Sequence, residues 1–535
     1  MNPQRGPLDK ARGAYYTEKR VAAALCRWAL RRSGERVLDP AFGGGVFLEA
    51  CARRLADLGG GEIFGVEVDR TAHAGATGGH GETLCGRRLL LADFFSLDAD
   101  SLPAMQAVVG NPPFIRFQRF TGETRARAAR RSLEQGVPLE PLAGSWVAFV
   151  AHATSFLATG GRLAMVVPAE LGHAPYARPL LSLLQHSFSR STIVSFRRSL
   201  FPHLDQRTVL VLADGFEEGP AEFRSLDLAG AEALEKPLPC AGDRALDADK
   251  LVTGRSSLAH AQLDAATMAL YRDLPERGAI HLGELARVES GYVTGANSHF
   301  HLSPGAALAS GLPNEVLVPA VLRSRALAGL TLTERDWPAA VESGAAGYLV
   351  QASGHEEHPA VAAFLRRLER AGVQDRYKTR NRAVWHKVPR VFAAPMLLTA
   401  MGGRGLRLVV NDAGLASPNT FHLVTPHSPD PAVRPSLAAA WLTSLTELSL
   451  ELEGHALGGG MLKCDPGEAL QVLLPPPAPL PPACLERLDR LLRDGEREAA
   501  RQEADRLLLS GALGLSSDEI DALANAAAEL STRRK

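Results

Sequence analysis

The N-terminal part of the sequence predicts an α/β fold built on a doubly wound, mostly parallel sheet. Short apolar segments alternate there with helical patterns, and these segments end near residues 39, 66, 91, 110 and 168. Each of the first four ends in an acidic residue or is followed within two residues by an acidic or amide residue. In an open parallel sheet, ligands bind beyond the carboxyl ends of the strands. The sequence therefore predicts a shared pocket at that edge.

Changes in composition predict four parts in the 535 residues. We expect a catalytic domain over 1–216 and an acidic, irregular connector over 217–257. An α+β region follows over 258–474. Residues 475–535 contain a stiff link with six prolines and then charged amphipathic helices, which we expect to pack on the preceding region or contact a partner.

The overall composition is that of a soluble globular protein, with 46% hydrophobic and 22% charged residues. Net charge is zero, so a basic surface must be local. The six cysteines are far apart in the sequence, which favours reduced, buried thiols over a disulfide framework or a metal site. We find no signal peptide and no apolar run that spans a membrane, and we expect a cytoplasmic protein.

A glycine-rich turn follows the first strand, which ends at Asp39. Gly43 and Gly45 lie in this turn, where glycine permits positive φ and close approach of a ligand to the backbone. The spacing differs from the dinucleotide fingerprint, and no Lys-Ser/Thr pair of a P-loop follows. The turn therefore favours a nucleoside that lacks a pyrophosphate.

The next two strands also end in carboxylates. Glu67 is placed to accept hydrogen bonds from ribose hydroxyls, and we prefer it to Asp69, which lies one step further out. Asp93 is placed to accept from the exocyclic amine of an adenine moiety, with Phe94 packing on its ring. Each carboxylate alone could instead cap a following helix.

The fourth strand runs into Asn111-Pro112-Pro113-Phe114. The prolines cannot extend a sheet ladder, so the strand stops and Asn111 lies at its end. An aromatic amine is a poor nucleophile because its lone pair is delocalised into the ring. The Asn111 side-chain oxygen and the Pro112 carbonyl could accept its two N–H groups and free the lone pair, while Phe114 stacks on the ring. The alternative is a Pro-Pro turn with a core phenylalanine.

In order along the chain, the motifs are Tyr-Tyr-Thr, Asp-Pro-Ala-x-Gly-x-Gly, Glu-x-Asp, Asp-Phe-Phe and Asn-Pro-Pro-Phe. This order resembles the gamma class of N6-adenine DNA methyltransferases, typified by the TaqI methyltransferase. The resemblance implies a class I S-adenosylmethionine-dependent methyltransferase fold, followed by a DNA target recognition domain. It also implies base flipping and a role in restriction–modification or phage defence.

The resemblance assigns residues to ligands. For S-adenosylmethionine it implies contacts with Tyr16, Thr17, Asp39, Ala41, Gly43, Gly45, Glu67, Asp93 and Phe94. For the target adenine it implies Asn111, Pro112, Pro113 and Phe114, with Phe201 packing on the opposite face of the base or serving as a core residue. Thr17 is also a plausible helix N-cap. The turn departs from the commoner Cys-Gly-Ser-Gly, and the catalytic aromatic is phenylalanine rather than tyrosine.

Two basic stretches are expected to contact double-stranded DNA. Residues 116–131 hold six arginines, including Arg116 and Arg119, against one acid, and predict a mobile loop that meets phosphates. Residues 360–410 hold eleven lysines and arginines against two acids. Aromatic and basic side chains alternate within this stretch, as they do on proteins that bind single-stranded or duplex nucleic acid. The residues concerned are Tyr377, Lys378, Arg380, Arg382 and Trp385. Solvated charged faces are the alternative for both stretches.

Two other functions remain open. Asn-Pro-Pro also serves methyltransferases that act on RNA or on protein glutamine, and a DNA-binding subunit with an inactive pocket would retain the same fold. The long basic C-terminal region favours DNA. Further partners are a separately encoded endonuclease or subunits of a defence system. Residues 291–300 resemble a glycine-punctuated hairpin at the start of the family's recognition domain.

Overall fold

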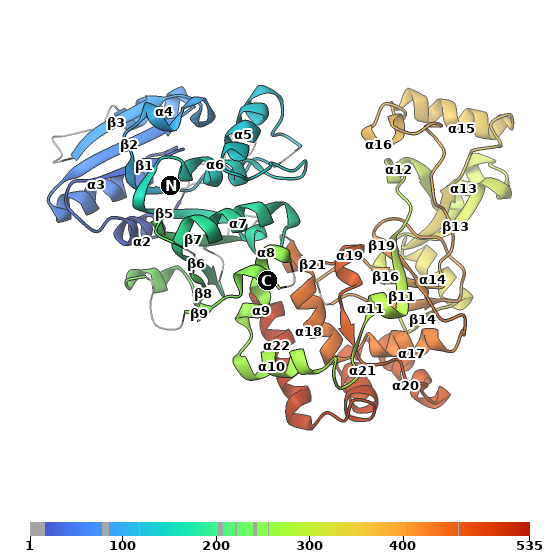
Figure 1. Cartoon of the computed structure of the whole chain (residues 1–535). Coiled ribbons are helices and arrows are strands. Elements are labelled where there is room, and N and C mark those ends of the chain that lie inside the picture. The colour runs from blue at the N-terminus through green and yellow to red at the C-terminus, as the bar shows by residue number, and fades with distance from the viewer. Residues whose placement is uncertain are drawn as a thin grey trace. The chain divides into compact units, whose positions relative to one another are not determined.

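The computed structural model divides into two compact units, residues 1–262 and 263–535 (Figure 1). It describes residues 17–77, 85–116, 118–198, 200–201, 207–219, 222–238, 243–254, 256–403, 405–457 and 460–534. Tyr16, which the sequence assigns to the cofactor, lies outside the described residues.

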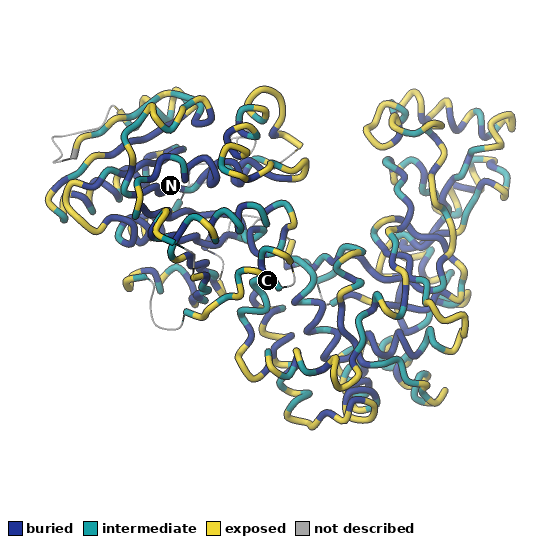
Figure 2. The backbone as a smooth tube through the Cα atoms, viewed as in Figure 1, coloured by how far each residue is buried: buried dark blue, intermediate teal, exposed yellow. Residues whose placement is uncertain are grey.

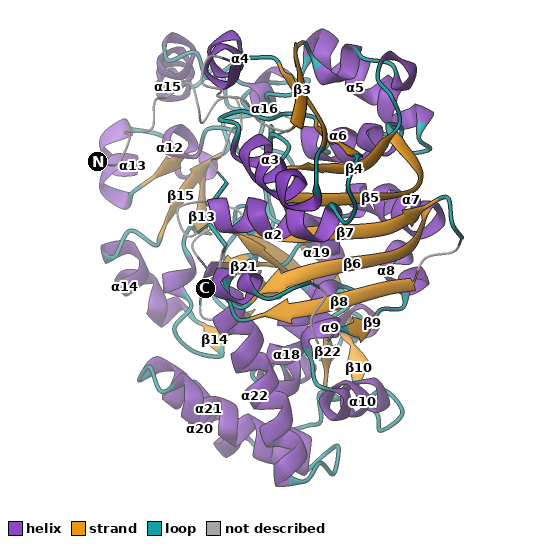
Figure 3. Ribbon diagram, turned by 90° about the vertical axis from the view of Figure 1, so that its left-hand side faces the viewer, coloured by secondary structure: helices purple, strands orange, loops and turns teal. Residues whose placement is uncertain are grey.

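The N-terminal unit contains a sheet of nine strands among its described residues, in the order β3-β2-β1-β4-β5-β7-β6-β8-β9. Figure 3 shows β4, β5, β7, β6 and β8 side by side in this order. The strands are β1 Glu35–Asp39, β2 Gly61–Glu67, β3 Cys85–Leu91, β4 Met105–Gly110, β5 Leu157–Pro168, β6 Phe188–Phe196, β7 Thr208–Phe216, β8 Glu222–Leu228 and β9 Arg244–Ala245. The strands from β3 to β5 are parallel, and β7 is antiparallel to both of its neighbours. The predicted doubly wound, mostly parallel sheet is confirmed.

Much of the backbone of the N-terminal unit is coloured as buried in Figure 2. Consecutive residues of the central strands are buried, as in Val37-Leu38 and Val108-Val109. Since successive side chains of a strand point to opposite faces, both faces of the sheet are covered. In the sheet, β2 pairs with one edge of β1, and β4 pairs with the opposite edge of β1. This reversal of strand order forms the crevice in which open α/β sheets bind ligands.

Most helices of the N-terminal unit contact strands of this sheet, whereas α5 packs on α6 and α8 packs on α7. α2 packs on α3, and α6 contacts α5, α7 and β5. Their bounds are α2 Lys19–Ala29, α3 Val46–Leu58, α4 Arg70–Thr77, α5 Gly122–Glu134, α6 Ser145–Thr154, α7 Arg178–Ser187, α8 Ala248–Thr253 and α9 Leu258–Gln262.

Two segments differ from their predicted structure. Most of 116–131, expected as a mobile loop, lies in α5, because Ala128 and Ser132 bury one helix face. The segment 217–257, expected as a connector, contributes β8, β9 and α8, and its Phe223 and Leu226 are buried in the core of the N-terminal unit.

The C-terminal unit is α+β. Its largest sheet has the order β11-β19-β16-β18-β14. The strands are β10 Ile280–His281, β11 Ala286–Ser290, β12 His301–Leu302, β13 Leu317–Val321, β14 Thr331–Leu332, β15 Ala346–Val350, β16 Met396–Thr399, β17 Met401–Gly402, β18 Leu408–Asn411, β19 Phe421–Pro426, β20 His455–Leu457, β21 Met461–Lys463 and β22 Leu473–Leu474. Residues 291–300 do not form the expected hairpin: Tyr292 bridges to Pro418, and a short helix follows.

The helices that end the chain share the core of the C-terminal unit. Leu488, Ala500 and Leu508 are buried with β16 and β18 residues, and α22 packs on α18. The helices are α10 Ala265–Asp273, α11 Leu282–Leu285, α12 Asn297–Phe300, α13 Pro304–Ser310, α14 Trp337–Glu342, α15 Pro359–Arg370, α16 Tyr377–Arg380, α17 Val433–Ala440, α18 Ser444–Glu453, α19 Pro466–Ala469, α20 Pro482–Arg493, α21 Arg497–Ala504 and α22 Ser517–Arg534. In the described part of the chain, no helix combines the length and the apolarity that crossing a bilayer requires.

Candidate functional site

The four polar residues predicted at the sheet edge lie at the carboxyl ends of four neighbouring strands. Asp39 ends β1 and Glu67 ends β2, while Asp93 and Asn111 follow β3 and β4. The parallel register pairs Asp39 with Gly65 and Leu38 with Val108, so these ends are level. The fold therefore brings the predicted polar side chains to one edge.

Asp39 is buried, with 2% of its surface exposed. Its Oδ1 accepts the Ala41 N–H at 3.1 Å, whereas no described residue provides a partner for Oδ2. A Cβ added at Gly110 would lie 3.1 Å from Oδ1, so the end of β4 approaches this carboxyl group closely. Burial raises the pKa of Asp39 to about 8; the Ala41 hydrogen bond opposes the rise, and the nearby Glu67 adds to it.

The glycine turn is tied to the end of β2. Gly43 has a φ of 49° and Gly45 a φ of 80°, a region that favours glycine. The Gly43 N–H donates to Glu67 Oε2 at 2.8 Å, and the Asp69 N–H donates to Oε1 at 2.8 Å. Each carboxylate oxygen can accept a further hydrogen bond. The Glu67 carboxylate thus positions the turn and retains acceptor capacity for a ligand.

Asp93 lies beside the N-terminus of a short 3₁₀ turn, Phe94–Ser96. Its Oδ1 accepts the Phe95 N–H at 3.1 Å, and its Oδ2 lies 3.5 Å from Nη2 of Arg127. Phe94 is 3% exposed and packs on Phe149, with ring centroids 5.6 Å apart. Asp93 is therefore positioned at the edge, whereas the Phe94 ring lies mainly in the core beneath it.

Asn111 lies where the chain leaves β4. Its Nδ2 donates to Oγ1 of Thr17 at 3.1 Å. Its Oδ1 is buried and has no partner within the described chain. The predicted capping role of Thr17 is wrong: Glu18 occupies the N-cap position of α2, and no side chain caps that helix. Thr17 instead lies beside the Asn111 carboxamide, and the Thr17 hydroxyl accepts a hydrogen bond from it.

The segment after Asn111 is anchored to α6. Phe114 is 5% exposed. On either side of it, the Ser145 hydroxyl donates to the Pro113 carbonyl and accepts the Ile115 N–H at 3.0 Å. Phe201, the other predicted aromatic, is 5% exposed and belongs to the same hydrophobic core as Phe114.

The arginines of 116–131 divide into two groups. Arg116 and Arg119 are exposed in the turn before α5. Arg125 instead donates to backbone carbonyls, including that of Glu140 at 2.8 Å. Arg131 is 8% exposed and lies 2.6 Å from Asp98 and 3.1 Å from Glu134. Arg130 is also exposed, on α5, with its Nε 3.8 Å from Glu134. Phosphate binding by this stretch stays a prediction, and Arg125 and Arg131 are engaged in contacts within the unit.

The basic and aromatic residues near α16 divide in the same way. Tyr377 is 67% exposed, and the Lys378 and Arg380 cations each lie 5.7 Å from its ring centroid. Arg382 donates to the carbonyls of Val293 at 2.6 Å and of Trp385 at 3.2 Å. Arg382 and the half-buried Trp385 therefore maintain the local fold, and the other three form an exposed cationic surface.

Sequence reasoning missed Val68, Leu91 and Ser145. Val68 is 71% exposed directly after Glu67, and Leu91 is 44% exposed at the end of β3. An apolar residue at or beside an acidic strand end is the local sequence feature that could have marked Val68 and Leu91 as candidates. The sequence gives no comparable signal for Ser145, because its partners lie about thirty residues earlier.

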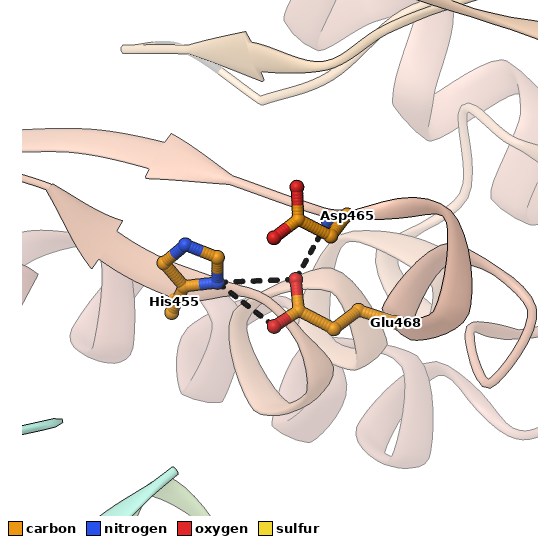
Figure 4. A group of neighbouring side chains, drawn as sticks. All are labelled: His455, Asp465 and Glu468. Carbon is orange, nitrogen blue, oxygen red and sulfur yellow. Dashed lines mark hydrogen bonds and ion pairs between the residues drawn. The ribbon is translucent and has the colours of Figure 1, made fainter. Parts of the chain in front are cut away.

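A cluster of His455, Asp465 and Glu468 in the C-terminal unit has ligand atoms within 4.8 Å of one another (Figure 4). Nδ1 of His455 lies 2.8 Å from Glu468, whose carboxylate also accepts the Asp465 N–H at 2.7 Å. The Lys463 ammonium lies 2.7 Å from the Asp465 carboxylate and balances its negative charge. These contacts join β20 and β21 to α19 as a structural brace.

Comparisons with known proteins match most of the chain. Residues 7–172 match the family described as N-6 DNA Methylase, and residues 256–509 match Type II methyltransferase M.Eco57I, C-terminal domain. Type II methyltransferase M.XamI of Xanthomonas campestris pv. amaranthicola is 25% identical over 489 residues, which cover 86% of this chain and 85% of that protein. Type II methyltransferase M.AccI of Acinetobacter calcoaceticus is 19% identical over 467 residues, covering 85% and 83%.

Among solved structures, the cryo-EM structure of a DrdV–DNA complex is similar in fold. The TM-score is 0.53 at 11% identity, and the match covers 91% of this chain and 58% of that one. At this identity the likeness concerns the fold alone.

Proposed function

The chain belongs to the N6-adenine DNA methyltransferases of the gamma class, and we propose that the edge formed by Asp39, Glu67, Asp93 and Asn111 is its active site. It is a DNA methyltransferase of a restriction–modification system. The reaction places a methyl group on N6 of a DNA adenine. The residues that bind the donor and the base, and the steps below, are our proposal.

The edge has the chemistry to hold S-adenosylmethionine, which supplies a methyl group on a positively charged sulfur. The unpartnered Asp39 Oδ2 suits a cationic ligand group, since a positive charge favours the carboxylate. The Glu67 oxygens retain acceptor capacity for ribose hydroxyls. Asp93 would accept from the adenine amine of the cofactor, and the exposed Val68 would cover its ring.

The further cofactor contacts come from the turn and from the segment before α2. Gly43 and Gly45 let the backbone approach the ligand closely, and Ala41 lies in the same turn. Phe94 supports Asp93 from the core. Thr17 acts on Asn111 through its hydroxyl.

One observation carries the proposed chemistry: Oδ1 of Asn111 is buried without a partner while Nδ2 is held by Thr17. A buried acceptor is normally paired, so a ligand is expected to supply the missing donor. In our proposal the target adenine amine donates one N–H to Asn111 and the other to the Pro112 carbonyl. These bonds localise the nitrogen lone pair. The nitrogen would form the new N–C bond as the bond between the methyl group and sulfur breaks, with the electron pair of that bond returning to sulfur. A carboxamide is not basic, so the displaced proton passes to solvent.

The base must leave the DNA stack to reach this edge. Phe114 stacks on one face of the flipped adenine, held by the Pro113 and Ile115 backbone, and Phe201 covers the other face. Duplex DNA is held through exposed cations. In this proposal the phosphate contacts come from Arg116, Arg119, Lys378 and Arg380, with Tyr377 beside a base.

Incubation of the purified protein with labelled S-adenosylmethionine and duplex DNA tests the function. Digestion of the DNA to nucleosides should place the label in N6-methyl-2′-deoxyadenosine. Label in RNA or in protein glutamine, with none in DNA, would favour the competing substrates. Binding of the cofactor without transfer to DNA containing all possible short sites would indicate an inactive pocket.

A further inference from the structure

A buried serine holds the backbone on both sides of Phe114. Ser145 begins α6 and is fully buried. Its hydroxyl donates to the Pro113 carbonyl and accepts the Ile115 N–H at 3.0 Å, and its own N–H donates to the Ile115 carbonyl at 3.0 Å. The two hydroxyl bonds therefore fix the peptide groups that flank Phe114, and the third bond fixes the next peptide group along the chain.

The local structure commits Ser145 to this contact. A first-turn serine commonly serves its own helix, yet Gly144 occupies the N-cap position of α6 and no side chain caps the helix. The backbones approach closely here, since a Cβ added at Gly144 would lie 3.2 Å from the Ile115 carbonyl oxygen. All ten residues of α6 are buried, so the helix is a rigid support.

The serine hydroxyl can do both tasks at once, because it donates and accepts from a single atom. Alanine would leave the Pro113 carbonyl and the Ile115 N–H without their partner. The segment would then shift or rotate, and the Phe114 ring would move with it. Phe114 has no regular secondary structure of its own to hold it.

We propose that Ser145 is a positioning residue for methyl transfer, which aligns Phe114 with the target base. This inference rests on the proposed stacking role of Phe114. Ser145 does not touch the base or the cofactor in this proposal, so its effect should pass through Phe114 alone. The expected signature is a lower kcat with unchanged binding of S-adenosylmethionine.

A double-mutant cycle tests the inference with single-turnover methyl transfer at saturating labelled S-adenosylmethionine. Ser145→Ala should lower the rate by about 10- to 100-fold, the size of effect that a small misplacement causes. In a Phe114→Ala background the same substitution should change the rate by less than about twofold, because coupled residues are not additive. The same fall in both backgrounds, or an unchanged rate in Ser145→Ala, would overturn the inference.

Ser132 provides the matched control. It is also fully buried, and its hydroxyl donates to the Val137 carbonyl at 2.7 Å, at the end of α5. Ser132→Ala should lower the thermal midpoint while leaving kcat unchanged. If Ser145→Ala does not fold, Ser145→Cys can replace it in the double-mutant cycle. The thiol keeps a weak donor, so we expect a smaller loss of single-turnover rate. Full activity of Phe114→Ala alone would instead contradict the proposed role of Phe114.

Discussion

At the scale of single residues, two buried oxygens define the site. Oδ2 of Asp39 and Oδ1 of Asn111 have no hydrogen-bond partner in the described chain, although both residues bond through their other side-chain atom. A buried polar atom left unpaired costs about 1–3 kcal/mol, so a ligand that supplies the missing partner is favoured at such an atom. These two atoms are therefore where we expect cofactor and base to bind.

Thr17 is expected to set the orientation of the Asn111 carboxamide. Thr17→Val removes the acceptor for Nδ2 with little change in shape, so the amide is free to rotate its oxygen away from the base. We expect a rate about tenfold lower in single-turnover methyl transfer, the effect of losing one hydrogen bond. Thr17→Ser keeps the hydroxyl and should retain most of the rate. Full activity in Thr17→Val would show that the amide does not depend on this contact.

Because the pKa of Asp39 is raised, we expect the affinity for the cofactor to depend on pH. With a pKa of about 8, the free carboxyl is protonated at neutral pH. A cationic ligand favours the carboxylate and lowers this pKa, so binding should release about one proton near pH 7. Affinity for S-adenosylmethionine should then increase as the pH rises toward 8 and level off above it. Calorimetry in buffers of different ionisation enthalpy counts the protons; equal heats in all buffers would contradict the assignment.

At the scale of elements, α5 changes the interpretation of the arginine-rich stretch. Arg131 is buried between Asp98 and Glu134 and donates to the Phe95 carbonyl at 3.3 Å, so it holds α5 to the rest of the unit. Arg119 lies exposed before the helix. The same residue type thus has two roles within one short stretch.

A pair of charge-matched variants separates these roles. Arg119→Gln should reduce the slope of log affinity for DNA against log salt by about 0.9, the effect of one lost phosphate contact. Arg131→Gln should lower the unfolding midpoint and leave the slope unchanged. Equal slopes for Arg119→Gln and the wild type would show that Arg119 does not contact a DNA phosphate.

Local patterns predicted the elements whose signals are local. The strands ending at Asp39, Glu67 and Gly110 were predictable because a buried apolar run stops at a polar residue or a proline. The helical state of 122–134 was not, because the burial of Ala128 and Arg131 depends on tertiary contacts with distant residues. The same limit applies to β8, whose parallel pairing with β6 joins residues about thirty positions apart.

At the scale of the whole molecule, positive and negative charges are equal in number, so DNA binding would depend on local basic surfaces. The chain has 59 lysines and arginines against 59 acidic residues, so no net field attracts DNA. In our proposal, the phosphate contacts come from the exposed cations before α5 and at α16. The C-terminal helices do not form a separate part, since they complete the hydrophobic core of the C-terminal unit.

The most direct test of the account is the Asn111→Ala variant, assayed for both methyl transfer to DNA and binding of S-adenosylmethionine. We expect the single-turnover rate to fall by at least about 10²- to 10³-fold, because the transition state loses its preorganised acceptor. The dissociation constant for the cofactor should stay within about threefold of the wild-type value, since Asp39 and Glu67 remain in place. A variant that methylates DNA adenine at the wild-type rate would contradict the central claim.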